Sequence, residues 1–132
     1  INRIISILIL MDKPAQAKTY LAEKDVIKKA PHKTSIFLKI NQSIIEFKLE
    51  RNREIRRELL NKIDDKLKII DGGEDYFEYK YKLIKLYETE YDNKNIVDVK
   101  KQKLKEEIEK KLKKDLRFTL KLKIESIKKK LL

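Results

Sequence analysis

Four of the six arginines in this sequence lie close together in one stretch, LERNREIRRELL, residues 49–60. They are Arg51, Arg53, Arg56 and Arg57. A helix is expected to begin in this stretch, and cations are disfavoured there because the helix dipole is already positive at that end. Guanidinium groups beside the free N–H groups of a helix start can bind phosphate or carboxylate. These residue types at this spacing therefore predict a polyanion-binding site.

A surface ion-pair network is the alternative explanation of the same stretch. Glu50, Glu54 and Glu58 alternate with the arginines and can neutralise them at the surface. Arg56 points towards the apolar side of the expected helix, where its stem can lie along apolar neighbours. In that case the cluster stabilises the fold and binds no ligand.

The C-terminal third of the chain carries most of the positive charge. Residues 94–132 contain 15 basic and 6 acidic residues, a net charge of +9 out of +12 for the whole chain. A field of that strength attracts polyanions such as nucleic acid or an anionic membrane surface. The candidate phosphate-binding residues of this segment are Lys110, Lys113, Lys114, Arg117, Lys121 and Lys123. Because lysine binds phosphate with less geometric specificity than arginine, compositional bias is an alternative source of this charge.

Aromatic and basic residues are interleaved in YFEYKYKLIKLYETEY, residues 76–91. On an exposed sheet face, Tyr76, Tyr79 and Tyr81 would offer rings for base stacking while neighbouring lysines contact phosphates. The alternative is that these aromatics form part of the core, which is the commoner use of an aromatic stripe.

One short segment, LILMDKPAQAK, residues 8–18, resembles the first strand and turn of a toprim nuclease or topoisomerase domain. The resemblance implies a divalent metal held by acidic residues at the ends of strands. Here Asp12 would have to replace the usual glutamate, and Asp64 and Asp65 fall inside an expected helix. A capping Asp12 before a helix that begins at Pro14 accounts for the same residues.

Other residues give little support for enzyme chemistry. The chain has no cysteine and a single histidine, His32, so thiolate chemistry is absent and a catalytic relay has one possible base. The acidic turn at residues 71–75 lacks the ligand spacing of a calcium loop. We expect a non-enzymatic protein with no catalytic residue, no metal and no cofactor.

Alternating and helical patterns follow one another along the chain. A nearly unbroken apolar run predicts a central strand, alternation on both sides of Asn41 and Gln42 predicts a hairpin, and Asn52 is expected to cap the second helix. The expected elements are a strand at 2–10, a helix at 14–30, paired strands at 34–40 and 43–50, a helix at 52–70, a strand at 75–88 and a helix at 97–114. This order predicts an α+β fold, a ferredoxin-like βαββαβ sandwich with a C-terminal helix-strand extension.

Two of these segments also fit a helix. Residues 75–88 have a helical alternative through Tyr79, Leu83 and Leu86. In residues 116–125, a strand places five apolar side chains on one face, namely Leu116, Phe118, Leu120, Leu122 and Ile124. The helical alternative for this last segment runs through Leu116, Leu120, Ile124, Ile127 and Leu131, and it leaves Phe118 and Leu122 unexplained, so we favour the strand.

Length and composition suggest one domain over residues 1–132, with a core at 1–93 and the basic extension at 94–132. The longest apolar run is too short to span a membrane, so we expect no transmembrane segment and an intracellular, cytoplasmic location. The expected function is a small basic module that binds nucleic acid, either RNA or DNA. The alternative is an accessory or structural subunit that docks on an acidic protein partner, and a homo-oligomer is compatible with either.

Overall fold

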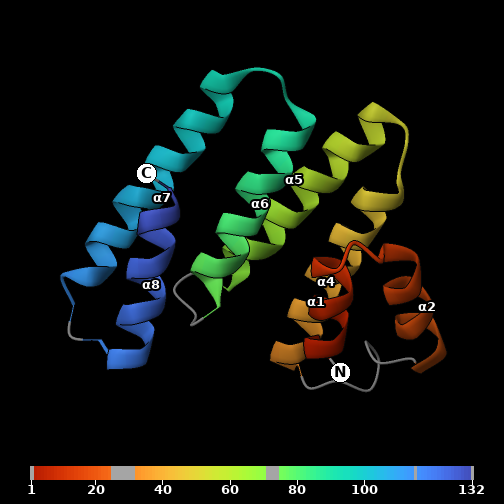
Figure 1. Cartoon of the computed structure of the whole chain (residues 1–132), viewed down its shortest axis with the longest axis horizontal. Helices are drawn as coiled ribbons and strands as arrows, with labels where there is room; N and C mark the ends of the chain where they lie inside the picture. Colours follow the sequence, from red (N-terminus) through yellow and green to blue (C-terminus); the bar gives the residue numbers. More distant parts are fainter. Residues whose placement is uncertain (1, 25–31, 71–74, 115, 132) are drawn as a thin grey trace. The chain divides into compact units, whose positions relative to one another are not determined.

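The computed structural model of the chain describes residues 2–24, 32–70, 75–114 and 116–131, and within these ranges it contains seven helices and no strand (Figure 1). The helices are α1 (Asn2–Leu10), α2 (Pro14–Lys24), α4 (His32–Leu49), α5 (Arg53–Ile69), α6 (Tyr76–Glu90), α7 (Lys94–Leu112) and α8 (Phe118–Lys130). None of these helices is long and apolar enough to cross a membrane.

The predicted α+β fold is wrong. The segments expected to be the central strand, the hairpin, the strand at 75–88 and the final strand form α1, α4, α6 and α8. There is therefore no ferredoxin-like βαββαβ core at residues 1–93 and no strand in the C-terminal extension, as far as the described residues go. The expected helices at 14–30, 52–70 and 97–114 correspond to α2, α5 and α7. The expected continuation of α2 through 25–30 and the expected stop of α5 at 71–73 lie outside the described residues.

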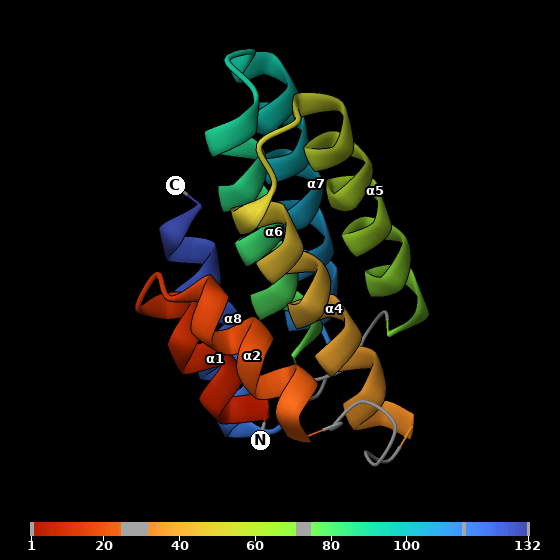
Figure 2. The same cartoon turned by 90° about the vertical axis from the view of Figure 1, so that its right-hand side faces the viewer.

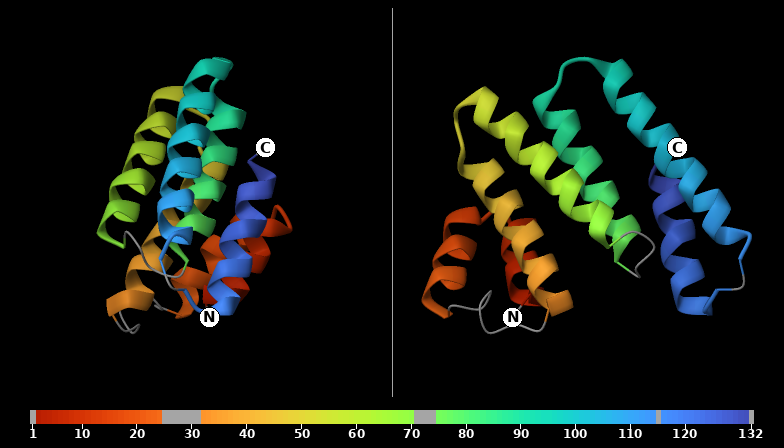
Figure 3. Two further views of the ribbon diagram at one scale, coloured as in Figure 1. Left: turned by 90° about the vertical axis from the view of Figure 1, so that its left-hand side faces the viewer. Right: turned by 180° about the vertical axis from the view of Figure 1, so that it is seen from behind.

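The chain divides into two compact units, Ile1–Lys66 and Leu67–Leu132. The first contains α1, α2, α4 and most of α5, and the second contains α6, α7 and α8 (Figures 1 and 3). One cooperatively folding domain can contain two such units, so the single domain over 1–132 stays a prediction.

The first unit is built on a core between α1, α2 and α4, which contact one another (Figure 2). Its buried centre consists of Ile5, Ala17, Leu21, Leu38 and Ile45. The run at 2–10 forms a helix because Ile5, Leu8 and Ile9 face this core at helical spacing. A run that is apolar at nearly every position satisfies a period of two and a period of 3.6 alike, so periodicity alone could not identify the element.

Helix α4 contains the residues that were expected to form a turn, and it buries one of them, Asn41, while Gln42 is exposed. Asn41 and Ser43 are almost completely buried in the middle of the helix. The Asn41 amide donates to the Ser6 hydroxyl over 3.4 Å, and the Ser43 hydroxyl donates to the Lys39 carbonyl, one turn earlier, over 3.2 Å. These bonds satisfy polar groups inside the first unit. The bond between Asn41 and Ser6 depends on the packing of α4 against α1, which the sequence does not reveal.

Arg56 joins the end of α4 to the start of α5. Its Nη1 atom donates to the carbonyls of Phe47 and Glu50, at 2.9 Å and 2.7 Å, and its guanidinium lies 4.1 Å from the centre of the Phe47 ring. The last carbonyls of a helix have no partner inside the helix, so Arg56 satisfies two groups that would otherwise need water. Asn52 caps α5 as predicted, since its Oδ1 accepts from the N–H groups of Glu54 and Ile55.

Helix α6 buries neighbouring pairs of residues, which a strand with one buried face cannot do. The pairs Leu83–Ile84 and Leu86–Tyr87 are buried together. The pair Tyr76–Phe77, about two helical turns before Leu83–Ile84, is buried in the same way. Helices α7 and α8 contact α6 and each other (Figure 1). Asn93 caps α7 by accepting from the N–H of Asn95 over 3.0 Å.

Helix α8 follows the helical alternative of the final segment. Ile124, Ile127 and Leu131 are buried on one face. Phe118 and Leu122 lie on the opposite face and are 73% and 50% exposed. The strand was favoured because it buried these two residues, and this is where the prediction failed.

Lys66 of α5 is partly buried against α4, where its ammonium donates a hydrogen bond to the Ser43 hydroxyl over 2.9 Å. Burial lowers the pKa of the Lys66 ammonium, the positive charges of Lys62 and Lys39 lower it further, and Glu46 opposes them. Because the Ser43 hydroxyl donates to the Lys39 carbonyl and accepts from Lys66, the lysine acts as a donor and not as a base towards this serine.

Replacing Arg56 by Ala should lower the free energy of unfolding by about 2 to 3 kcal/mol, because two charge-assisted hydrogen bonds and a cation–π contact are lost. The variant Arg56→Lys should lose less free energy of unfolding than Arg56→Ala but should not reach the wild type, since an ammonium cannot reproduce the planar fork of a guanidinium. The exposed neighbour Arg53 is the matched control, and Arg53→Ala should change stability by less than about 0.5 kcal/mol. Urea unfolding followed by circular dichroism measures all three, and equal losses for Arg56→Ala and Arg53→Ala would contradict this role.

Replacing Lys66 by Met should change how stability depends on pH. Since the folded state lowers the pKa of Lys66, the unfolded chain binds more protons between that lowered pKa and the ordinary value for lysine. The free energy of unfolding of the wild type should therefore rise with pH across this window relative to Lys66→Met. Urea unfolding of both proteins from neutral pH to about pH 11 tests this, and parallel curves would contradict it.

Candidate nucleic-acid interface

The arginine stretch is divided between structural and exposed residues. Arg51 and Arg53 are exposed, whereas Arg56 and Arg57 are half-buried. The guanidinium of Arg56 is occupied by the two carbonyls at the end of α4. Arg51 and Arg53 are therefore the two side chains of this group that present exposed positive charge beside the start of α5.

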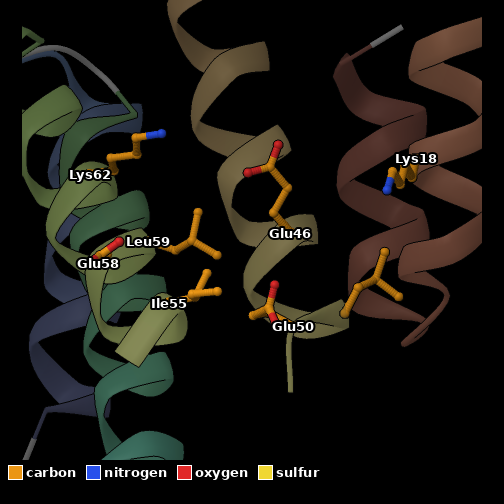
Figure 4. Close-up of a pocket in the computed structure, with 8 residues that line it drawn as sticks. Lys18, Glu46, Glu50, Ile55, Glu58, Leu59 and Lys62 are labelled. Carbon is orange, nitrogen blue, oxygen red and sulfur yellow. The ribbon is translucent and has the colours of Figure 1, made fainter. Parts of the chain in front are cut away.

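A groove of about 470 Å³ lies beside this stretch in the first unit, between α2, α4 and α5 (Figure 4). Its lining combines Glu46, Glu50 and Glu58 with Lys18 and Lys62 and with apolar side chains. Glu50 is already engaged, because its Oε1 accepts from the N–H groups of Arg51 and Asn52. Three carboxylates against two ammonium groups make this groove an unfavourable place for phosphate.

Acidic residues do not come together as a metal site in the part of the chain that the structure describes. Asp12 lies in the turn between α1 and α2 with a φ of 55°, a left-handed conformation that Asp tolerates, and its carboxylate is 4.0 Å from the Lys48 ammonium. Asp64 and Asp65 lie inside α5. The segment that resembles the first strand and turn of a toprim domain contains the end of α1, the turn that follows and the start of α2, with no strand.

The tyrosines named for base stacking lie on α6. Tyr76 and Tyr79 are buried, and Tyr81 is half-buried. The Tyr76 hydroxyl donates to Glu107 over 2.7 Å, and the ammonium groups of Lys85 and Lys130 lie 5.4 Å and 5.5 Å from the Tyr81 ring centre. Their role in stacking stays a prediction, but these contacts place all three rings in the packing of the second unit.

Several basic residues of the second unit are paired with acidic ones. Lys123, a predicted phosphate-binding residue, is 3.4 Å from Asp75 and 3.9 Å from Glu78. Lys101 is 2.8 Å from Glu88, and hydrogen bonds from Lys101 and Lys85 lower the pKa of that carboxyl. These ion pairs neutralise part of the positive charge of the unit.

The remaining predicted residues lie on either side of the turn between α7 and α8, and Figure 1 shows where these two helices lie. All of them are exposed, and we call them the turn patch: Lys110, Lys113, Lys114, Arg117 and Lys121. The last turn of α7 ends at this patch and α8 begins at it, with no acidic residue in the first turn of α8. Residues 110–123 hold seven basic residues and one acidic residue, Asp115, so half of the chain's net charge of +12 lies in this short segment.

Sequence reasoning missed Phe118, which directly follows Arg117 and is 73% exposed beside the turn patch. The signal that could have found it is its place in the helical alternative, where it falls opposite the apolar stripe.

Comparison of the chain with models of protein families, with curated proteins and with solved structures finds no match.

Proposed function

We propose that this protein is a small basic module that binds nucleic acid, RNA or DNA, through the turn patch. The observation that carries the proposal is the exposure of all five cations of the patch around one turn. Contacts between cations and phosphates release counterions and supply most of the affinity in binding without sequence preference. The patch needs no catalytic group for this function, and none is assigned.

The geometry of the turn adds to the attraction of the five charges. Arg117 precedes the first residue of α8 without capping it through its side chain, so the first N–H groups of the helix lie beside the patch. The positive end of the helix dipole and these N–H groups favour an anion at the same place. We assign Arg51 and Arg53 a second, weaker contact, because they are exposed but only two in number.

Affinity for a single-stranded oligonucleotide of about 15 nucleotides should fall steeply with salt. In the variant Lys113→Ala/Lys114→Ala/Arg117→Ala, binding at low salt should weaken by about tenfold or more. The slope of log K against log salt should become shallower by about 2, because each phosphate contact on a single strand contributes roughly 0.7. Fluorescence anisotropy between about 50 mM and about 200 mM salt measures both quantities.

A matched variant separates the turn patch from the overall charge. Lys94, Lys103 and Lys129 are exposed and lie outside the turn patch, and replacing all three by Ala removes the same charge. This control should weaken binding much less than the patch variant. Equal weakening by both variants would show that the net positive charge of the chain, and not the turn patch, binds the ligand. Absence of binding at low salt would contradict nucleic-acid binding itself.

A second candidate is an accessory subunit of a larger assembly that docks on a protein partner. The observation that favours it is the outer face of α1, where Ile4, Ile7 and Leu10 are 44%, 47% and 75% exposed. An exposed apolar face of this kind is typical of an interaction surface. A stoichiometric protein partner that survives nuclease treatment and is lost on Ile7→Asp would favour this candidate over the first.

A further inference from the structure

Phe118 is the one exposed residue among the tyrosines and phenylalanines, all of which the structure describes. The chain has six tyrosines and four phenylalanines, all within the described residues, and the other nine are buried or half-buried. Phe118 is 73% exposed at the first position of α8. Its ring faces solvent because Ile124 and Ile127, on the opposite side of the helix, are buried in the second unit.

The fold gives no reason for an aromatic ring at this position. Burial of a Phe side chain stabilises a fold, and little of that stabilisation is gained at a site that is so open to water. Leu122, one turn later on the same face, is 50% exposed and extends the apolar surface. Two adjacent apolar side chains that face solvent do little to stabilise the helix. Their position indicates instead a surface that contacts a ligand.

The cations around Phe118 indicate which ligand that is. Arg117 precedes it directly, Lys121 is its neighbour three residues later on α8, and Lys114 lies just before the turn, all exposed. A single nucleic-acid strand offers the two matching groups, a phosphate for each cation and the flat face of an unpaired base for the ring. An exposed aromatic ring that lies close in sequence to exposed cations is complementary to both groups at once.

Duplex nucleic acid fits the same surface less well. Its bases are stacked on one another, and a ring from outside can reach a base face only after a base step is opened, which costs free energy. One aromatic contact does not offset that cost. A strand whose bases are already unpaired gains the contact without it.

We propose that Phe118 stacks on an unpaired base and that the turn patch therefore selects single-stranded over double-stranded nucleic acid. The proposal rests on nucleic-acid binding by the turn patch. Phe118 supplies the preference for unpaired bases, and the surrounding cations supply the affinity for phosphate.

Because the chain contains no tryptophan, Phe118→Trp creates a single fluorescent reporter at the proposed contact. Titration with a single-stranded oligonucleotide of about 15 nucleotides should quench its emission as the indole stacks on a base. The matched control is Leu10→Trp, at a position that is similarly exposed, 75%, but lies at the end of α1 in the other unit. Its emission should stay unchanged over the same titration.

Affinity measurements on two further variants separate stacking from simple apolar contact. Phe118→Ala should weaken binding of the single strand by about 5- to 150-fold, the range found when a stacking residue is removed. Phe118→Leu keeps an apolar side chain without a ring and should weaken it almost as much. Neither change should alter binding of the matching duplex, and circular dichroism confirms that each variant remains helical.

Several results would overturn the proposal, and they are distinguishable from failure of the proposed function. The Phe118→Trp variant could bind in a salt-dependent way without quenching of its emission, or the Phe118→Ala and Phe118→Leu variants could lose equal affinity for the single strand and the duplex. Either result would be compatible with nucleic-acid binding and would contradict the stacking role. Absence of binding to either form would remove both. Stronger binding of the reporter variant to vesicles of anionic lipid than to the oligonucleotide, with a blue-shifted emission, would assign Phe118 to a membrane surface instead.

Discussion

The bond between Arg56 and the end of α4 determines how the arginine stretch is used. A helix that ends beside another helix must satisfy its last carbonyls without free access to water. Arg56 does this for Phe47 and Glu50 while its plane covers the Phe47 ring. An arginine that sequence reasoning assigned to a ligand therefore stabilises the fold, and exposed cations elsewhere in the chain are the better candidates for contact with a ligand.

The helices that sequence reasoning found are those with distinctive ends. Pro14 begins α2, Asn52 caps α5, and the charged stretch of α7 follows a cap at Asn93. Capping and proline geometry are local effects, so the sequence contains them fully. The helices that were missed alternate apolar and charged residues, as in α8, or are apolar throughout, as in α1. Their side chains fit either period, and contact between helices decides the outcome.

The sequence shows which residues of the candidate site are charged, but it does not show which of them have partners. Charge can be read from a sequence, and the five cations of the turn patch were all named from it. Whether a charge is free for a ligand depends on partners from other helices, and the pairing of Lys123 with Asp75 across the second unit could not be foreseen. Phe118 was assigned to a core because a strand would bury it, and only the helix turns it towards solvent. Correct secondary structure is thus a precondition for finding the site.

The alternating sequence of α8 has a consequence for the unfolded chain. A segment such as RFTLKLKIE can pair edge to edge with a copy of itself whenever the helix opens, because its apolar residues then share one face of a strand. The lysines and the arginine on the other face place like charges in register in any such stack, which opposes aggregation. The same cations that we assign to phosphate binding in the folded protein would thereby keep partly unfolded molecules apart. A polyanion that neutralises them would remove this protection, so the ligand proposed for the folded state would promote aggregation of the unfolded one.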